Sequence, residues 1–310
     1  MILIVGATGQ LGHATAMALL NQGHSVRALV RDRAKAVELQ KAGAEIFIGD
    51  LTDVRSLELA CKGAERVFAC AHSMLGRGKY ASAQVDHVGH SALVVAARSA
   101  KVEHFVYTSA MGARESHPID FFRTKHEIEA VVKASGMGWT ILRPAAFMEH
   151  HVHRFNGQML LERGFTVIIG SGNKPRNFVA VRDVAPFAVQ ALAEDGLNGR
   201  TLEIGGPDNP TNNDVAAMYQ VRARKGRIHH VSAGAAKVLA SIVKPMHEGI
   251  ARVLELSAVP DREMRETWEP GKLLAEFPRE LTAVETFIDE RVAEWRRTQR
   301  SPSANPSRSH

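Results

Sequence analysis

Cysteine, aromatic residues and long apolar runs are all scarce in this 310-residue chain. Its two cysteines, Cys61 and Cys70, provide neither a disulfide framework nor the paired spacing of a zinc site, so we expect reduced thiols and a cytoplasmic location. No uninterrupted apolar stretch has the length that crosses a membrane. An apolar strand begins at Ile2, so we expect no signal peptide. The sequence therefore argues against a disulfide-stapled secreted domain and against a membrane-spanning protein.

Acidic residues are in the minority, with 33 Asp and Glu against 39 Lys and Arg, and the net charge is +6. Much of this excess lies at residues 291–310, which hold five arginines and one acid, Glu294. The Ser-, Pro- and Arg-rich end predicts a disordered tail over residues 298–310. Elsewhere no basic patch is interleaved with aromatic residues, so we expect no nucleic-acid partner. The remaining positive charge suits an anionic small ligand.

The most informative stretch is MILIVGATGQLG at the start of the chain. The apolar run from Ile2 to Val5 predicts one buried strand, and the spacing of the apolar residues from Leu11 to Leu19 predicts a helix. In the glycine turn between them, backbone N–H groups at the helix start would face a diphosphate. The first glycine would permit the tight turn, the second would let the diphosphate approach, and the third would let the helix pack closely. The predicted contacts are Gly6, Thr8, Gly9, Gln10, Leu11 and Gly12.

Strand and helix patterns alternate through the first 110 residues, and the strands are continuous apolar runs. This pattern predicts an α/β fold with a doubly wound parallel sheet. Ligands of such sheets bind outside the carboxyl ends of the strands, so residues at those ends should converge on one cleft. The further cofactor contacts predicted there are Asp50, Leu51, Ala71, His72 and Thr108.

The carboxyl end of the strand predicted at 24–30 is followed by Arg31, Asp32, Arg33 and Lys35. In a dinucleotide-binding fold an acidic residue here binds the 2′-hydroxyl of the adenosine ribose, whereas an arginine favours a 2′-phosphate. Arg31 comes first, so the sequence favours NADP(H), with Arg31 and Lys35 as contacts. Asp32 leaves NAD(H) open, and the alternative to both is a solvated loop of mixed charge.

Five segments, GATGQLG, ALVRD, GDLTD, VYTSA and WTILRPAAFME, resemble the NmrA-like branch of the atypical short-chain dehydrogenases/reductases. Within that branch the chain is most similar to NAD(P)H-binding quinone-reductase-like and sugar-epimerase-like proteins. The resemblance covers roughly residues 1–207. It implies a Rossmann domain over residues 1–150, whose sheet is completed by segments near 178–207. It also implies a smaller C-terminal α/β lobe over 151–297, interleaved with the sheet, and contacts to the nicotinamide from Pro144, Ala145 and Phe147.

The wider superfamily uses a Tyr-x-x-x-Lys pair in which the tyrosine transfers a proton. The matching segment here keeps the lysine as Lys125 but has Phe121 at the tyrosine position. A phenyl ring has no exchangeable proton, so Phe121 cannot be the general acid. The resemblance leaves Lys125 a role at the nicotinamide ribose, and the alternative is a solvated lysine on a helix. The other candidate proton sources are Tyr107, Ser109 and His126.

Without the tyrosine, we expect an NAD(P)H-dependent oxidoreductase that delivers hydride to a small electrophile such as a quinone, which needs positioning more than a dedicated acid. The alternative is a non-catalytic NADP-binding redox sensor, and a nucleotide-sugar epimerase or dehydratase is disfavoured. The substrate is not identified by the sequence, and a homo-oligomer is compatible with the apolar residues of 233–258.

Two groups of histidines raise the question of a metal site. His87 and His90 lie with Asp86 in a helical pattern rich in Ala and Val, which is typical of ordinary helix residues. His150 and His153 could share a helix face, but no third ligand is evident. We therefore predict no metal.

Overall fold

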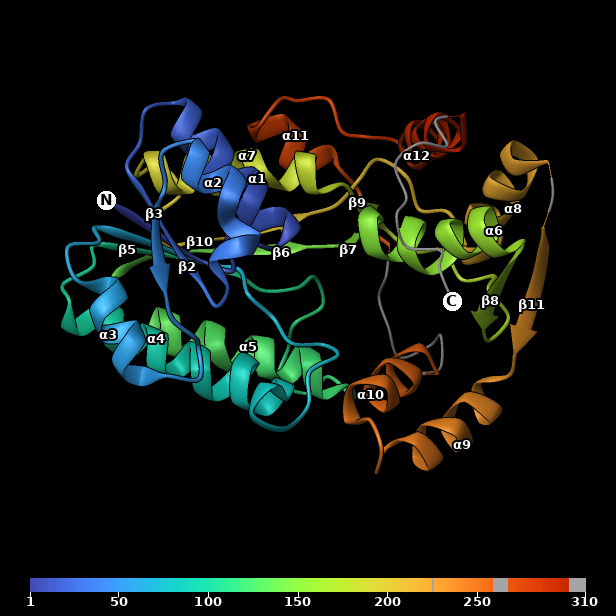
Figure 1. Cartoon of the computed structure of the whole chain (residues 1–310), viewed down its shortest axis with the longest axis horizontal. Coiled ribbons are helices and arrows are strands. Elements are labelled where there is room, and N and C mark those ends of the chain that lie inside the picture. Colours follow the sequence, from blue (N-terminus) through green and yellow to red (C-terminus); the bar gives the residue numbers. More distant parts are fainter. Residues whose placement is uncertain (225, 259–266, 301–310) are drawn as a thin grey trace.

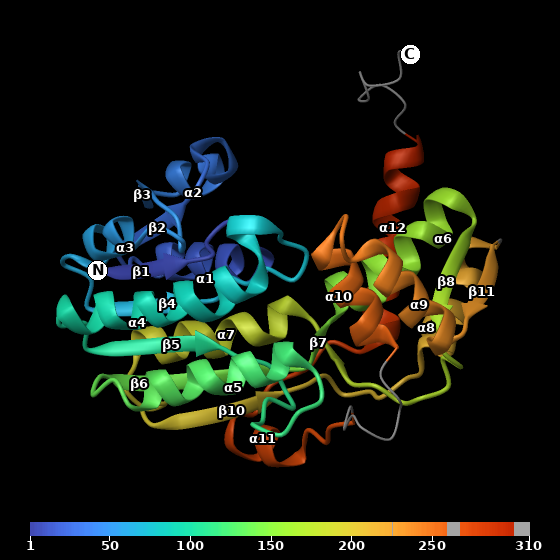
Figure 2. The same cartoon turned by 90° about the horizontal axis from the view of Figure 1, so that it is seen from below.

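A seven-stranded parallel sheet forms the centre of the protein in a computed structural model that describes residues 1–224, 226–258 and 267–300 (Figures 1 and 2). The strands lie in the order β10-β6-β5-β4-β1-β2-β3, and all their pairings are parallel. Their bounds are β1 Ile2–Val5, β2 Val26–Val30, β3 Glu45–Ile48, β4 Arg66–Ala69, β5 His104–Thr108, β6 Gly138–Pro144 and β10 Arg200–Ile204. The predicted doubly wound parallel sheet is thereby confirmed.

Helices cover both faces of this sheet (Figure 1). One face carries α1 (Gln10–Asn21), α2 (Val37–Lys41), α7 (Val181–Ala193) and α11 (Gly271–Glu276), and the other carries α3 (Val54–Cys61), α4 (His90–Ser99) and α5 (Asp120–Lys133). Because both faces are covered, every residue of β1 and of β5 is buried. This explains why β1 is an uninterrupted apolar run and why β5 is apolar on both of its faces between His104 and Thr108.

Short helical segments interrupt the regular pattern at three places. The 3₁₀ segments η1 (Arg33–Ala36) and η2 (Gly78–Tyr80) follow β2 and β4. The helix predicted over 83–99 is divided, since its first part, η3 (Ala83–Gly89), is π-helical and only then does α4 begin. Gly89 lies close to the loop between β3 and α3, because a Cβ on Gly89 would be 2.8 Å from the carbonyl oxygen of Leu51. The wider turn of η3 therefore ends against the neighbouring loop.

The C-terminal part of the chain packs beyond the carboxyl ends of the strands (Figure 2). Its elements are η4 (Glu149–Gly157), α6 (Gln158–Arg163), β8 (Phe165–Ile169), α8 (Asn212–Ala223), β11 (Arg227–Val231), α9 (Ala233–Val243), α10 (Glu248–Ser257) and α12 (Val284–Arg300). β8 pairs with β11, while β7 (Ala146–Phe147) pairs with β9 (Phe178–Val179) outside the main sheet. Thus, of the segments near 178–207, β10 joins the main sheet and β9 does not.

This region has a hydrophobic core of its own, built on Met148, Val152, Tyr219 and Phe287. The terminal helix α12 buries Val284, Phe287 and Val292 in this core. It continues to Arg300, so residues 298–300 of the predicted tail are helical, while 301–310 lie outside the described residues. Among the described residues, no helix combines the length and the apolar character needed to cross a membrane.

Asp183 has a different structural role from the N-cap that its place before an apolar helix suggests. The N-cap of α7 is Ala180, and Asp183 lies within the first turn. Its carboxylate accepts hydrogen bonds from the N–H and the hydroxyl of Thr282, both at 2.9 Å. Asp183 therefore fixes the chain ahead of α12 to the Rossmann part, and burial raises the pKa of its carboxyl group.

His104 gives the sheet a predicted sensitivity to acid. Its side chain is 3% exposed, and its Nε2 lies 2.9 Å from the hydroxyl of Thr140 on the neighbouring strand. Burial, and then the positive charge of Arg66, lower the pKa of its imidazole from 6.5 to about 4. Between these values the unfolded chain binds a proton that the folded protein does not, so stability is lost as pH falls. Lowering the pH from 7 to 5 should remove about 2 kcal/mol of unfolding free energy through this residue.

The measurement is urea unfolding of wild type and His104→Gln at pH 7 and pH 5, since glutamine keeps an N–H donor but does not titrate. The variant should lose about 2 kcal/mol less than wild type over this range. Equal losses in both proteins would show that His104 is protonated in the folded state.

Candidate functional site

The glycine turn after β1 is held in a shape that side chains would prevent. Gly6 has φ +101°, and a Cβ there would lie 2.7 Å from the backbone nitrogen of Ala71. A Cβ on Gly12 would lie 2.2 Å from the carbonyl oxygen of Gly6. The third glycine therefore lets the first turn of α1 pack directly on the turn that precedes it. Gly9 is looser, with φ −81° and its N–H bonded to the Gly6 carbonyl at 2.9 Å.

The amino end of α1 is open to an anion. Its N-cap is Gly9, which offers no side chain, and its first turn contains no acidic residue. By contrast, Asp53 caps α3 and Thr211 caps α8 with their side chains. Thr8, Gly9 and Gln10 are exposed. The first N–H groups of a helix have no partners within the helix and carry partial positive charge. The cradle formed by these glycines therefore fits a diphosphate.

The ends of β2 and β3 place two acidic residues in structural roles. Asp32 accepts a hydrogen bond from the N–H of Ala34 at 2.9 Å and so caps η1. Asp50 accepts from both the N–H and the hydroxyl of Thr52. Arg31 and Lys35 are exposed, whereas Leu51 is buried. The carboxylate of Asp32 is therefore engaged by the backbone, while the guanidinium of Arg31 is accessible.

Lys125 lies in the interior of the site rather than on a solvated face of α5. Its side chain is 3% exposed, and its ammonium donates to the carbonyl oxygen of Thr108 at 3.0 Å. The same ammonium lies 4.9 Å from the centre of the Tyr107 ring and 5.8 Å from that of Phe121. Burial lowers the pKa of Lys125, against the negative charge of Asp86. The alternative of a solvated helix lysine is therefore wrong.

The candidate proton sources differ in accessibility. Tyr107 is fully buried, its hydroxyl has no hydrogen-bond partner among the described residues, and burial raises its pKa well above 10. The hydroxyl of Ser109 is also buried and donates to Glu129 at 2.5 Å. His126 is half-buried, and its Nδ1 has no partner in the described part of the chain. The Ser109 hydroxyl is therefore occupied by its hydrogen bond to Glu129, and the Tyr107 hydroxyl stays protonated at neutral pH.

Two buried carboxylates support this region, and sequence reasoning missed both roles. Asp86 is 1% exposed and accepts from the N–H of Ser73 at 2.9 Å and from the hydroxyl of Ser82 at 2.5 Å. Glu129, also 1% exposed, receives two hydrogen bonds from the Arg143 guanidinium, at 2.8 and 2.6 Å. Both roles could have been predicted from the sequence, because each acidic residue lies on the apolar side of a helix, where a buried charge without a partner costs much free energy.

The remaining predicted contacts lie at the ends of β4 and β6. Ala71 is half-buried and His72 is exposed. Pro144 and Ala145 are buried and continue the backbone hydrogen bonding, because the Pro144 carbonyl accepts from Met111 and the Ala145 N–H donates to Ile204. Phe147, in β7, is half-buried. Ala71, His72, Pro144 and Ala145 thus lie at or just after the ends of β4 and β6, and the cofactor contacts of all five residues stay a prediction.

Two histidines of η4 contact different side chains. Nδ1 of His153 lies 3.1 Å from the hydroxyl of Tyr219, and the His151 ring packs edge-on against Phe155. Burial lowers the pKa of His151 to about 3. Among the described residues, no group of three or more His, Cys, Asp or Glu side chains is arranged to hold a metal ion.

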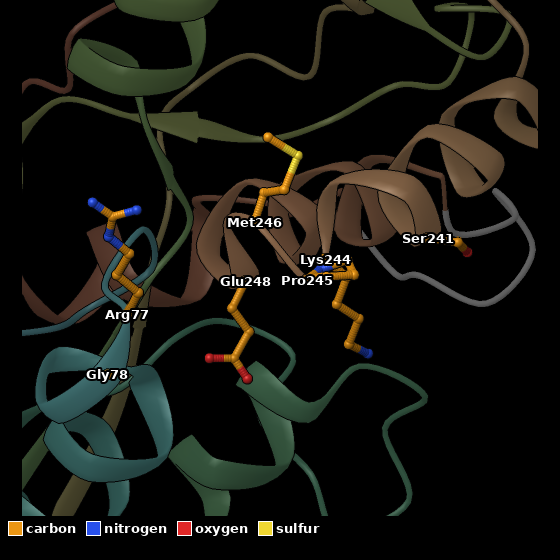
Figure 3. A pocket seen from close by; sticks show the side chains of 7 residues that line it. All are labelled: Arg77, Gly78, Ser241, Lys244, Pro245, Met246 and Glu248. Carbon is orange, nitrogen blue, oxygen red and sulfur yellow. The ribbon is translucent and has the colours of Figure 1, made fainter.

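A surface hollow of about 560 Å³ lies where the loop after β4 meets the turn between α9 and α10 (Figure 3). It is lined by Arg77, Gly78, Ser241, Lys244, Pro245, Met246 and Glu248. Met246 is 78% exposed, so the hollow is open to solvent. Its lining shows that the C-terminal helices reach the loop that follows β4.

Comparison with known proteins identifies the family to which this chain belongs. The model of the NmrA-like family matches residues 1–287. An NAD(P)H azoreductase from Xenophilus azovorans is 31% identical over 288 residues, which cover 89% of this chain and 96% of that protein. The crystal structure of an NADPH-dependent quinone oxidoreductase from Escherichia coli, complexed with NADPH, is 26% identical with a TM-score of 0.75 and covers 94% of this chain and 99% of its own.

A triphenylmethane reductase from Citrobacter has the same fold, with 24% identity and a TM-score of 0.75 over 94% of this chain and 99% of its own. The match of the family model extends well beyond the segments that carry the resemblance in the sequence. On this evidence the chain belongs to the NmrA-like family.

Proposed function

We propose that this protein is an NAD(P)H-dependent oxidoreductase that prefers NADP(H) and reduces a small electrophile such as a quinone or an azo compound. The observation that carries the proposal is the first turn of α1, which is accessible, free of acidic residues and without a side-chain cap. The names of the azoreductase and quinone-oxidoreductase relatives support the same class of reaction.

The cofactor would be held along the carboxyl edge of the sheet. The glycine turn would bind the diphosphate, and Arg31 the 2′-phosphate, because Asp32 is engaged as a cap. Lys125 donates one hydrogen bond to Thr108, so its ammonium keeps N–H groups for a ribose hydroxyl. Asp50, Leu51, Ala71 and His72 would border the adenine and ribose, and Pro144, Ala145 and Phe147 the nicotinamide.

The bound dinucleotide would supply a hydride, which adds to the electrophile together with one proton. In the balanced reaction, the acceptor, NADPH and H⁺ give the two-electron-reduced acceptor and NADP⁺. Phe121 lies on the same side of α5 as Lys125, where it can provide an apolar wall but no proton. Because Tyr107 is buried and Ser109 is bonded to Glu129, the proton would come from solvent or from His126.

The C-terminal lobe, residues 151–297, would cover the substrate. α10 packs directly on the loop after β4, since a Cβ on Gly249 would lie 2.5 Å from the backbone of Leu75. Arg252 on the same helix lies 3.4 Å from Asp120 at the start of α5. These contacts hold α10 against the loop after β4 and the start of α5, and a small-molecule substrate could be enclosed between α10 and the strand ends. We further propose a cytoplasmic location.

The test is a titration with NADPH and NADH, followed by a panel of quinone and azo acceptors with the same sample. NADPH should bind more tightly than NADH, and at least one acceptor should accelerate NADPH oxidation. Tyr107→Phe should retain the rate within about twofold, because a phenol with so high a pKa contributes little as an acid. A tenfold loss in this variant would instead identify Tyr107 as the proton source. Tight NADPH binding without oxidation by any acceptor would favour the non-catalytic sensor.

A further inference from the structure

We propose that Lys79 and Tyr80, from the loop after β4, complete the site for the cofactor's 2′-phosphate together with Arg31. Lys79 would supply a second positive charge, and Tyr80 would act as a positioning residue for both cations. The inference rests on the proposed function and extends it, because neither residue belongs to the strand end at which ribose recognition is expected.

The geometry brings two cations to one aromatic ring. The guanidinium carbon of Arg31 lies 4.9 Å from the centre of the Tyr80 ring, and the ammonium of Lys79 lies at the same distance, 4.9 Å. The electron-rich face of an aromatic ring attracts such cations. The ring therefore gathers side chains from two segments that are far apart in the sequence.

The two cations beside Tyr80 are not ion-paired in the part of the chain that the structure describes. Neither Arg31 nor Lys79 forms an ion pair with a carboxylate among the described residues. Asp32, the nearest acid in the sequence, is engaged with the backbone of Ala34. Two positive charges near one ring raise the electrostatic potential there and so favour an anionic ligand. A phosphate monoester, with two negative charges and several acceptor oxygens, is the ligand chemistry that suits this pair.

The Tyr80 ring is fixed from the interior of the protein. Buried Asp86 accepts from the N–H of Ser73, and the hydroxyl of Ser73 donates to the carbonyl oxygen of Tyr80. The ring itself packs against the core that contains Leu29 and Leu51. Arg31 follows β2, the strand end at which the adenosine ribose is expected, and its guanidinium contacts the Tyr80 ring, so the ring lies on the adenosine side of the cleft. Lys79 and Tyr80 are thus placed beside the ribose rather than beside the nicotinamide.

The experiment measures dissociation constants for NADPH and NADH, and for 2′-AMP and 5′-AMP as fragments, by calorimetry. Lys79→Gln should weaken the binding of NADPH and 2′-AMP about tenfold, as expected for the loss of one charge-assisted contact. The affinities for NADH and 5′-AMP should stay within twofold of wild type. Tyr80→Leu should weaken the binding of NADPH and 2′-AMP about fivefold. Tyr80→Phe should bind both with the wild-type affinity, because it keeps the ring face. Lys272→Gln, at an exposed lysine on α11, is the matched control and should change nothing.

The possible outcomes separate this inference from the function on which it rests. Equal weakening of NADPH and NADH, or no weakening of either, would overturn the role of Lys79 and Tyr80 while the oxidoreductase remains. A wild-type protein that binds neither dinucleotide would overturn the proposed function itself. If Tyr80→Leu does not fold, as judged by circular dichroism, Lys79→Gln decides the question alone.

Discussion

Replacing Gly9 by valine is expected to weaken NADPH binding by about 100-fold in a protein that still folds. Gly9 has φ −81° and ψ 162°, an extended conformation that suits a β-branched residue. A Cβ there meets only the Gly6 carbonyl oxygen, at 3.2 Å, so a small shift can accommodate it. The side chain would, however, stand at the exposed helix start and keep the diphosphate from the first N–H groups of α1. Losing two charge-assisted hydrogen bonds corresponds to about 3 kcal/mol or more.

Two further glycine variants make the result specific. Gly12→Ala should destabilise the fold itself, by about 1–3 kcal/mol, since its Cβ would lie 2.2 Å from the Gly6 carbonyl oxygen. Gly196→Val is the matched control, because a Cβ at that position meets nothing within 4 Å. Calorimetric titration gives the affinity, and urea unfolding gives the stability. Undiminished NADPH affinity in folded Gly9→Val would show that the dinucleotide does not bind at this turn.

The fold could be predicted largely from local pattern. The run from Ile2 to Val5 is uninterruptedly apolar because helices cover both faces of the sheet, and the glycine turn follows it directly. Alternation of such runs with helices is sufficient to predict a doubly wound parallel sheet. The strand ends that carry Arg31, Asp50 and Thr108 then follow from topology, without knowledge of any side-chain contact.

The site could be predicted only in part, because its supporting contacts link distant segments. Asp183 holds the chain ahead of α12, but its partner, Thr282, lies about a hundred residues later in the sequence, so no local pattern predicts this contact. Ser109 remained a candidate proton source because its partner Glu129 could not be recognised from spacing. Likewise, Lys125 could equally have been solvated until its bond to the Thr108 carbonyl placed it inside. Periodicity identifies the face of an element, whereas these pairings depend on how separate elements meet.

The second large effect is expected at Glu129, beneath the end of β5. Its carboxylate accepts hydrogen bonds from Ser109 and, twice, from Arg143. These bonds raise the pKa of the Arg143 guanidinium, which remains charged. Glu129→Ala would leave that partly buried charge with only the longer contact to Glu203, at 3.8 Å, and losses of this kind amount to about 3–5 kcal/mol. Because whole domains are stable by only about 5–15 kcal/mol, the variant should unfold at a much lower urea concentration.

The controls for Glu129 lie on the same helix and in the same pair. Glu127→Ala removes an exposed carboxylate whose contact with His87 is solvated, so it should change stability by less than about 0.5 kcal/mol. Glu129→Ala combined with Arg143→Met removes both charges and should recover part of the loss, since a buried pair replaced by apolar side chains is often neutral. If the double variant is no more stable than Glu129→Ala, the loss does not arise from an uncompensated guanidinium.

Ser109 follows Thr108, whose carbonyl oxygen accepts a hydrogen bond from Lys125. Loss of the Glu129 carboxylate that holds Ser109 should therefore also reduce NADPH affinity. Stability and cofactor binding would then fall together, as expected if the buried carboxylate maintains the edge of the sheet on which the dinucleotide lies.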